Sequence, residues 1–591
     1  MNTAERLVGT MAALDVEYVF GYPGGRVIEV FESLAEARAG DHPGVDPEAV
    51  PEVVRPRDER EASVMAEAYG RLTGGPAVLA GQGPWIGSLG GIGQMEARLG
   101  SSPMVVLTEA SERGEYSTLA PYQQARGDYG GLDLPSILDG ITKEHWFPRS
   151  PTETVRSFQL AFKHAAAGRA GPCAVVLDGD AVTDEVPEDP TPPVWDDAAQ
   201  TRTWESRPTD GDVRAAADLL SEAHRPVVLA GNGVHAAGAY EELEAVAEAY
   251  DAVVATSYLG KATIAETHER AAGVIGSFGH EGANRVVSEA DALLVVGCRL
   301  NPMDTNWQPA SFIRPDEQAI VHADVDPRNA GWVYPADVGL IGDAAESLGA
   351  LIDAAEGRLG PEDPAPGITA DGWGEHGHDS ALDRAAAARE DFHVPECDSD
   401  AVPIKPQRAC KAVEAVVDED TVVTADSGNN RFWLLNYLQT PARRTYFGSG
   451  GVGGMGWAPP AAVTAALMGH DAVCVAGDGG FTMTMTAVET AVDHGVAPAF
   501  VVLNDTSLGM VRQMDDAIPG VEFHDTDFVK AAEAMGGAGT RVTDPDDLEP
   551  AIADAKAADV PTVVDVRIDR EEDMAEQLQS SFYAEVGGLH E

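Results

Sequence analysis

The chain has 591 residues and a formal net charge of −57 at pH 7. Without a basic patch to contact phosphates, the sequence disfavours nucleic-acid binding. Acidic residues are spread along the whole chain rather than collected in runs, and lysines are few. This pattern predicts a halophilic protein that stays hydrated at very high salt, where charge repulsion is screened.

The chain carries five cysteines, whose spacing does not match a metal site, so we expect core residues in a reducing compartment. The N-terminus leads directly into an amphipathic helix, without a signal segment. No run reaches the roughly 18 apolar residues that span a bilayer. We therefore expect a soluble, cytoplasmic protein without a membrane partner.

Strand and helix patterns alternate in the first part of the chain, which we assign to a domain over 1–184. A helix is expected at 4–14, and short apolar runs predict strands at 16–20, 77–80, 104–108 and 173–177. The turn Gly21-Tyr-Pro-Gly-Gly25 follows the first strand. A Pro-rich, acidic linker over 185–205 closes the domain.

The same alternation predicts two further domains, over 206–359 and 403–575, separated by a second linker over 360–402. An acidic tail over 576–591 ends the chain. All three domains are predicted to be α/β folds with doubly wound parallel sheets. Their expected strands lie at 227–230, 292–296, 319–323, 421–425, 472–476, 500–503 and 562–566.

Two acidic side chains directly follow neighbouring strands of the third domain. One strand ends at Gly477-Asp478-Gly479-Gly480, and the next ends at Asn504-Asp505. The carboxyl ends of parallel strands meet at one edge of a sheet, where open α/β folds bind ligands. Carboxylate oxygens beside Gly-rich backbone predict a site for a diphosphate held through Mg²⁺.

Two glycine motifs leave other hypotheses about the bound ligand open. Gly451-Val-Gly-Gly-Met-Gly456 has the spacing of a dinucleotide-binding turn, which would make the protein an NAD enzyme. The pair Pro459-Pro460 argues against it, because prolines fall where the phosphate-binding helix would begin. Gly231-Asn-Gly-Val-His-Ala236 predicts either an adenine-dinucleotide cradle or a tight turn, and the pattern does not decide between them.

Residues 57–71 read as a helix that is entered through charged residues, with Glu59 at the end of its apolar face. The charge pattern alone favours a simple explanation, in which an acidic group near a helix N-terminus is stabilised by the helix dipole.

These motifs, in this order, resemble those of the thiamine-diphosphate (ThDP) enzymes of the acetohydroxyacid (acetolactate) synthase large-subunit type. The resemblance covers nearly the whole chain, and it places Glu59 on the family's catalytic glutamate. The matching segments are 16–25, Pro103-Met-Val-Val-Leu-Thr108, Ile141-Thr-Lys143, Gly171-Pro-Cys173, Leu259-Gly-Lys261, His322-Ala-Asp-Val-Asp-Pro327, Asp426-Ser-Gly428, 449–456, Gly477-Asp-Gly479 and 508–513.

The resemblance implies a pyrimidine-binding first domain, a Rossmann-like central domain and a diphosphate-binding third domain. The cofactor would lie between the first domain of one subunit and the third domain of its partner, in a homodimer or homotetramer. Glu59 would hydrogen-bond the cofactor's pyrimidine, Gln123 would face the substrate, and Met455 would bend the cofactor. Asp478, Asp505 and the Ser507 carbonyl would hold Mg²⁺. The other implied cofactor-binding residues are Tyr22, Pro23, Gly24, Gly428, Asn429, Asn430, Gly453, Gly477, Gly479, Gly480, Met510 and Val511.

The chain also departs from the synthase pattern. Asp505 replaces the expected asparagine, and Met514 replaces an aromatic residue near the substrate. The segment 299–304 lacks the Phe-Asp-Asp-Arg sequence that accompanies bound FAD, so FAD is left open as a further cofactor. Arg60 follows Glu59 where the family has glutamine, and the loop 81–85 lacks the usual Gly-Pro-Gly. These changes leave the substrate open while keeping ThDP and Mg²⁺.

The resemblance implies decarboxylation of a small, pyruvate-like 2-keto acid, followed by carboligation to a second carbonyl compound. Acetolactate synthesis, in branched-chain amino acid biosynthesis, is the reading that it favours. A simple 2-keto acid decarboxylase, or another ThDP carboligase or lyase, is the alternative within the class. A catalytically silent nucleotide-binding protein is the alternative from another class.

Overall fold

The computed structural model describes residues 1–42, 44–110, 132–178, 181–191, 193–195, 197–357, 380–515 and 517–574. The predicted substrate-facing Gln123, the start of the second predicted linker and the acidic tail 576–591 therefore lie outside the described residues. The chain divides into two compact units. The first comprises Met1–Trp204, Gly450–Met468 and Thr484–Gly495, and the second comprises Glu205–Ser449, Gly469–Met483 and Val496–Glu591. Among the described helices, none has the length and hydropathy of a membrane span.

A six-stranded parallel sheet forms the centre of the first unit, as far as it is described, in the order β2-β1-β3-β4-β6-β5. Its apolar strand residues pack against α1, α2 and α8 in one buried cluster. The strands are β1 (Tyr18–Gly21), β2 (Glu52–Val54), β3 (Ala77–Ala80), β4 (Met104–Ala110), β5 (Glu144–Trp146) and β6 (Pro172–Asp178). The helices are α1 (Thr3–Ala13), α2 (Ile28–Arg38), α3 (Glu59–Thr73), α4 (Gly83–Gly87), α5 (Gly91–Gly100), α7 (Leu134–Ile141), α8 (Pro151–Ala166), α9 (Asp197–Thr201), α18 (Ala458–Leu467) and α20 (Ala487–His494).

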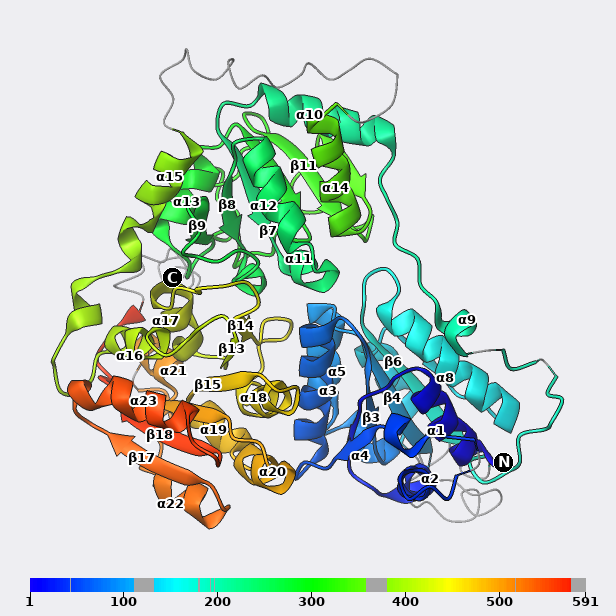
Figure 1. Ribbon diagram of the computed structural model, residues 1–591. Helices are drawn as coiled ribbons and strands as arrows, with labels where there is room; N and C mark the ends of the chain where they lie inside the picture. The colour runs from blue at the N-terminus through cyan, green and yellow to red at the C-terminus, as the bar shows by residue number, and fades with distance from the viewer. Residues whose placement is uncertain are drawn as a thin grey trace. The chain divides into compact units, whose positions relative to one another are not determined.

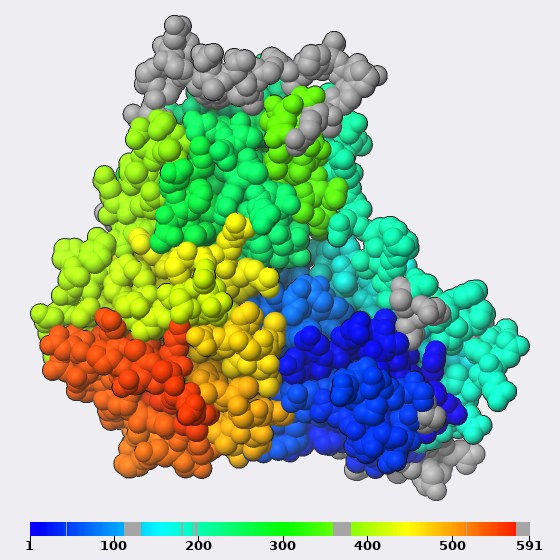
Figure 2. Space-filling model, in the orientation of Figure 1, coloured from blue at the N-terminus to red at the C-terminus, as the bar shows by residue number. Residues whose placement is uncertain are grey.

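The second unit contains two parallel sheets, of which the earlier in sequence has the order β12-β11-β10-β7-β8-β9. Alternate strand residues face opposite ways: Val228 packs with α10, α12 and α14, whereas Val227 packs with α13 and α15. Figure 1 shows these helices on the two faces, and Figure 2 shows the green residues of this sheet region as one continuous surface. The elements are β7 (Pro226–Ala230), β8 (Val253–Thr256), β9 (Ala271–Val274), β10 (Ala292–Val296), β11 (Ala319–Asp324), β12 (Val338–Ile341), α10 (Asp210–Glu222), α11 (Asn232–Ala237), α12 (Tyr240–Ala249), α13 (Glu281–Ser288), α14 (Ala344–Ala355) and α15 (Ala381–Ala388).

The other sheet of the second unit has the order β14-β13-β15-β16-β18-β17, again with parallel pairing. Counted from its own first strand, this order is 2-1-3-4-6-5, the same as in the first sheet. The elements are α16 (Pro406–Glu414), β13 (Thr421–Ala425), α17 (Asn429–Tyr437), β14 (Tyr446–Gly448), β15 (Asp471–Gly477), α19 (Asp478–Thr484), β16 (Ala499–Asn504), α21 (Gly509–Met514), α22 (Phe528–Ala534), β17 (Ala538–Val542), α23 (Leu548–Lys556) and β18 (Thr562–Arg567).

The α/β fold class predicted from sequence is confirmed: three six-stranded, all-parallel sheets alternate with helices in the described residues. Each long apolar run became a strand within two residues of its predicted bounds. Seven strands had not been predicted, namely β2, β5, β8, β9, β12, β14 and β17. Most of these lie at or near sheet edges and are short or partly exposed, so they lack a continuous apolar run.

Candidate active site

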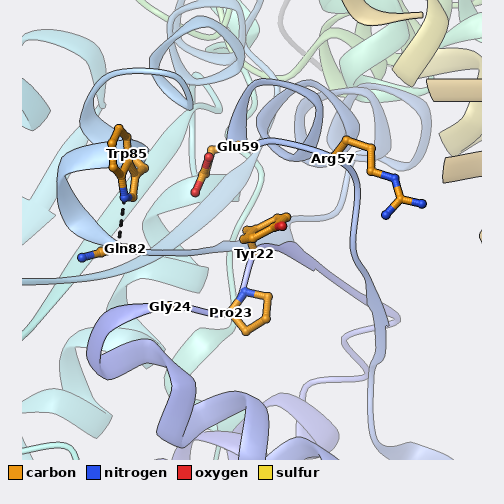
Figure 3. A pocket seen from close by; sticks show the side chains of 7 residues that line it. All are labelled: Tyr22, Pro23, Gly24, Arg57, Glu59, Gln82 and Trp85. Carbon is orange, nitrogen blue, oxygen red and sulfur yellow. Dashed lines mark hydrogen bonds between the residues drawn. The ribbon is translucent and has the colours of Figure 1, made fainter. Parts of the chain in front are cut away.

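A pocket of about 360 Å³ opens at the carboxyl edge of the first sheet. Strand β1 ends at Gly21 and is followed by Tyr22, Pro23 and Gly24, which line the pocket beside Glu59. Strands β1 and β3 are neighbours at the point where the strand order changes direction. Open α/β sheets bind ligands at such switch points. Figure 3 shows the Glu59 carboxylate directed into this space.

Glu59 is the first residue of α3, and local capping sets where this helix begins. The Asp58 side chain accepts a hydrogen bond from the Glu61 backbone N–H at 2.9 Å, which satisfies one free donor of the first turn. The helix ends at Gly74, which has the left-handed conformation (φ +76°) that glycine adopts at low cost. Glu59 is only 8% exposed. Burial raises the pKa of its carboxyl, and the charge of Asp58 adds to this effect.

Three further residues line the same pocket and had not been predicted as site residues: Arg57, Gln82 and Trp85. The Trp85 ring N–H donates to the Gln82 side-chain oxygen at 3.1 Å (Figure 3). Arg57 pairs with Glu489 at 2.7 Å. The topology offered a signal for Gln82, because it follows β3, the strand beside β1. A search of both strand ends at the switch point would have found it.

The second unit brings the two predicted metal ligands together. Strands β15 and β16 are adjacent, with Gly477 opposite Leu503, so Asp478 and Asp505 follow neighbouring strand ends. Burial raises the pKa of Asp478 to about 7, and the negative charge of Asp505 contributes to the rise. Burial also raises the pKa of Asp505, while hydrogen bonds from Ser507 and the charge of Arg512 oppose this.

Within the described residues, no three His, Cys, Asp or Glu side chains form a metal cluster. A cation at this edge would therefore use the two carboxylates with other oxygens, and the buried Ser507 supplies a nearby backbone carbonyl. The Ser507 N–H already donates to Asp505 at 2.9 Å. Asp478 is buried and Asp505 is half-buried, and the charge of Asp505 raises the pKa of Asp478. Such a pair fits a divalent cation, because the charge of the cation would remove the repulsion.

The predicted diphosphate-binding residues gather at the same edge of the third sheet. Gly428 has φ +121°, which favours glycine, and it turns the chain from β13 into α17. Asn429 begins α17, and its side chain donates to Gln513 at 3.0 Å, which links α17 to α21. Helix α21 also carries Met510 and Val511. An added Cβ on its first residue, Gly509, would lie 2.5 Å from a side-chain oxygen of Asp505, so a side chain there would displace that carboxylate.

Asn430, Gly477, Gly479 and Gly480 complete this set. The Asn430 side chain donates to the Asp426 carbonyl at 2.8 Å, and the Gly479 N–H donates to Asp478 at 2.9 Å. Strands β13 and β15 carry these residues at their ends, and they are neighbours at the switch point of the sheet. Helix N-termini and Gly-rich backbone at such an edge suit an anion such as a diphosphate.

The Gly-rich segment that contains Gly453 and Met455 belongs to the first compact unit. Met455 lines a small pocket together with Val64 and Ile92, and the Gly453 N–H donates to the Glu96 carboxylate at 3.2 Å. Pro459 and Pro460 lie in the first turn of α18, where proline is tolerated. These prolines are therefore compatible with a helix that begins here, and they do not by themselves decide against a dinucleotide-binding turn.

The other glycine motif forms a close turn. Gly231 follows β7, and helix α11 begins at Asn232. An added Cβ on Gly231 would lie 2.4 Å from the Gly297 carbonyl, and one on Gly233 would lie 2.5 Å from the Gly297 Cα. These glycines are thus required by the close approach of two strand ends, β7 and β10, whether or not a ligand binds there.

Comparison with known proteins places the chain in a family. Three models of thiamine pyrophosphate enzymes match it in order: the N-terminal TPP binding domain over residues 1–130, the central domain over 213–351 and the C-terminal TPP binding domain over 426–566. The chain belongs to the thiamine pyrophosphate (ThDP) enzymes, and each of the two matched TPP-binding domains overlaps one of the two sheets of equal strand order.

Its relatives define the type within that family. The probable acetolactate synthase large subunit of Methanocaldococcus jannaschii is 30% identical over 586 residues, which cover 96% of this chain and 92% of the relative. Acetolactate synthase isozyme 3 large subunit of Escherichia coli is 29% identical over 570 residues, 94% of this chain and 92% of the relative. The chain is therefore a ThDP-dependent enzyme of the acetolactate synthase large-subunit type.

Proposed function

We propose that the protein decarboxylates a pyruvate-like 2-keto acid and joins the remaining fragment to a second carbonyl compound, as in acetolactate synthesis. The observation that carries this proposal is the buried Glu59 in a pocket at the switch point of the first sheet. A carboxyl group with a raised pKa, directed into a pocket, suits proton transfer to and from a ring nitrogen.

Each residue of the candidate site would have a separate role. ThDP, when bound, supplies an electron sink for the carbon–carbon bond that breaks at the keto acid. Glu59 would hold and move the proton at the pyrimidine nitrogen, and Tyr22, Pro23 and Gly24 would form the wall beside it. Met455 would act as an apolar support beneath the cofactor, while Gln123 would face the substrate.

We propose that Mg²⁺ binds Asp478, Asp505 and the Ser507 carbonyl and so anchors the diphosphate. The mutual repulsion of the two carboxylates supports this proposal. The remaining contacts to the diphosphate would come from Gly428, Asn429, Asn430, Gly477, Gly479, Gly480 and the α21 residues Met510 and Val511. The sequence leaves open whether FAD is a further cofactor.

We also propose the domain boundaries 1–184, 206–359 and 403–575, with linkers over 185–205 and 360–402. A homodimer or homotetramer is the proposed assembly, because the resemblance places each cofactor between two subunits. The named relatives are large subunits, which supports assembly into an oligomer.

Product analysis tests the proposed reaction. The purified chain, supplied with ThDP, Mg²⁺ and pyruvate in molar salt, is expected to form acetolactate. Acetaldehyde without acetolactate would instead identify a simple decarboxylase. Calorimetry with ThDP plus Mg²⁺ against NAD provides a second test, since binding of NAD alone would contradict the proposal.

The requirement for salt is a separate proposal, carried by the net charge of −57. Acidic groups at this density repel one another in dilute buffer, and salt screens that repulsion. We expect the free energy of unfolding to rise between 0.1 M and 3 M KCl, as measured by chemical denaturation. Full activity and stability in dilute buffer would contradict this expectation.

A further inference from the structure

A buried ion-pair triad lies in the first compact unit, away from the Glu59 pocket. Helix α3 contributes Glu67 and Arg71, and helix α5 contributes Glu96. The Arg71 guanidinium contacts the Glu67 carboxylate at 2.6 Å and the Glu96 carboxylate at 2.9 Å, and all three side chains are at most 3% exposed. Two buried acids thus share one base; because burial raises the pKa of Glu67 while the pKa of Glu96 is lowered, the negative charge on Glu96 is the one that other groups must compensate.

Backbone N–H groups of the Gly-rich segment supply that compensation. Gly450 and Gly451 donate to one carboxylate oxygen of Glu96 at 2.9 and 2.7 Å, and Val452 and Gly453 donate to the other at 2.8 and 3.2 Å. Four successive N–H groups therefore surround one side chain, which is the geometry of a backbone anion nest. These N–H groups and Arg71 hold the pKa of Glu96 below its usual range.

The far end of the same segment is held by the other acid of the triad. The ring N–H of Trp457 donates to Glu67 at 2.7 Å, and the Arg71 guanidinium lies 5.1 Å from the centre of the Trp457 ring. Met455 lies between these two attachments in the chain, and it lines a small pocket with Val64 and Ile92. The close fit continues at Gly451, where an added Cβ would lie 2.7 Å from the Glu96 backbone carbonyl.

We propose that Glu96 is a positioning residue for Met455: its carboxylate fixes the backbone of 450–453 and thereby the place of the methionine that supports the cofactor. This inference rests on the proposed function, because it assigns Met455 to the cofactor. A hydrogen bond to a charged acceptor stabilises a structure more than one between neutral groups. Four such bonds converge on the Glu96 carboxylate and hold the backbone of 450–453 in place. Apolar side chains would have filled the same space without directing four N–H groups to one point.

The test compares Glu96→Gln with Glu36→Gln, a matched change at an exposed position of α2 in the same unit. Gln keeps the shape of the side chain but offers one acceptor oxygen and no charge. In the full chain, we expect amide hydrogen exchange in peptides covering 450–453 to rise at least about tenfold in E96Q, with peptides from β3 and β4 unchanged. E36Q should match the parent chain throughout.

The second set of measurements is the affinity for ThDP and the kinetics of the reaction. In E96Q we expect the Kd for ThDP to rise at least about tenfold and kcat to fall, while KM for the 2-keto acid stays within about twofold. Glu96→Asp keeps the charge, should give intermediate values, and carries the test should E96Q not fold. Unchanged exchange over 450–453, or faster exchange with unchanged Kd and kcat, would overturn the inference. Failure of the proposed function is distinguishable, because the parent chain itself would then bind no ThDP.

Discussion

The first and third sheets share one strand order, and each has a candidate ligand site at its carboxyl edge, yet the two candidate sites use acidic residues differently. In the first sheet, a single carboxyl group, Glu59, lies in the pocket; burial is the largest cause of its raised pKa, and the charge of its chain neighbour Asp58, which caps the same helix, adds to it. In the third sheet, two carboxyl groups follow adjacent strands, and the charge of Asp505 adds to burial in raising the pKa of Asp478.

The number of acidic groups determines what each site can bind. A lone buried carboxyl lowers its free energy by holding a proton, so it is suited to exchange that proton with a ligand. A pair of buried carboxylates lowers its free energy by binding a cation, which compensates both charges at once. The same topology can therefore present either a proton carrier or a metal site, depending on how many acids follow its central strands.

Replacing the lone carboxyl should have the largest effect. Glu59→Gln keeps the shape but removes the exchangeable proton, so we expect kcat to fall by about 10²–10⁴. The Kd for ThDP with Mg²⁺, measured by calorimetry, should change by less than about threefold, because the metal site is intact. Glu36→Gln serves as the control and should retain parent activity. A rate unchanged by Glu59→Gln would contradict the role proposed for this residue.

Glu61 offers a second test of the effect of burial, which is the largest cause of its shifted pKa, with a smaller contribution from the charge of Asp58. It lies two residues after Glu59 on α3, and its carboxylate accepts hydrogen bonds from Thr486 and from Thr490, the latter at 3.2 Å. Burial raises the pKa of Glu61 to about 7 from an ordinary value near 4.5. The folded state therefore holds a proton that the unfolded state releases, and stability falls as pH rises from about 4.5 to about 7.

Glu61→Gln should remove that loss. We expect E61Q to be more stable than the parent at pH 8 by up to about 3 kcal/mol, and the difference to shrink towards zero near pH 4.5. Chemical denaturation at several pH values, at constant molar salt, measures this difference. Equal stability of the two proteins at pH 8 would show that burial does not keep Glu61 protonated.

Asp505→Asn tests the paired acids. Asparagine keeps an oxygen ligand but removes one negative charge, so Mg²⁺ should bind about tenfold more weakly, in line with about 1.4 kcal/mol. Without the cation, the folded chain should become more stable, because Asp478 loses its negative neighbour. The substitution is therefore expected to weaken metal binding and to stabilise the metal-free fold. If it weakened both, the proposed repulsion between Asp478 and Asp505 would be contradicted.

The sequence predicted the central strands, the acidic pair and the turn Tyr22 to Gly24 beside Glu59, but not the rest of the pocket. Runs such as 472–476 and 500–503 are apolar because both faces of the strand are buried, and the acids that end them could be located without a structure. Short edge strands such as β2 and β5 leave no such pattern. Gln82 and Trp85 were missed because their role depends on the neighbouring positions of β1 and β3, which only the strand order reveals.

Trp85→Phe should give the smallest effect and tests whether these missed residues belong to the site. The substitution keeps an aromatic ring but removes the N–H that orients the Gln82 side chain at 3.1 Å. One neutral hydrogen bond contributes about 1 kcal/mol, which corresponds to about a fivefold change in an equilibrium constant. We therefore expect the Kd for ThDP, or KM for the keto acid, to rise about fivefold. Trp195→Phe, at a tryptophan with an exposed side chain, is the control and should change neither constant. If the Kd for ThDP and the KM for the keto acid are both unchanged in Trp85→Phe, the site on this sheet is restricted to Glu59 and the turn after β1.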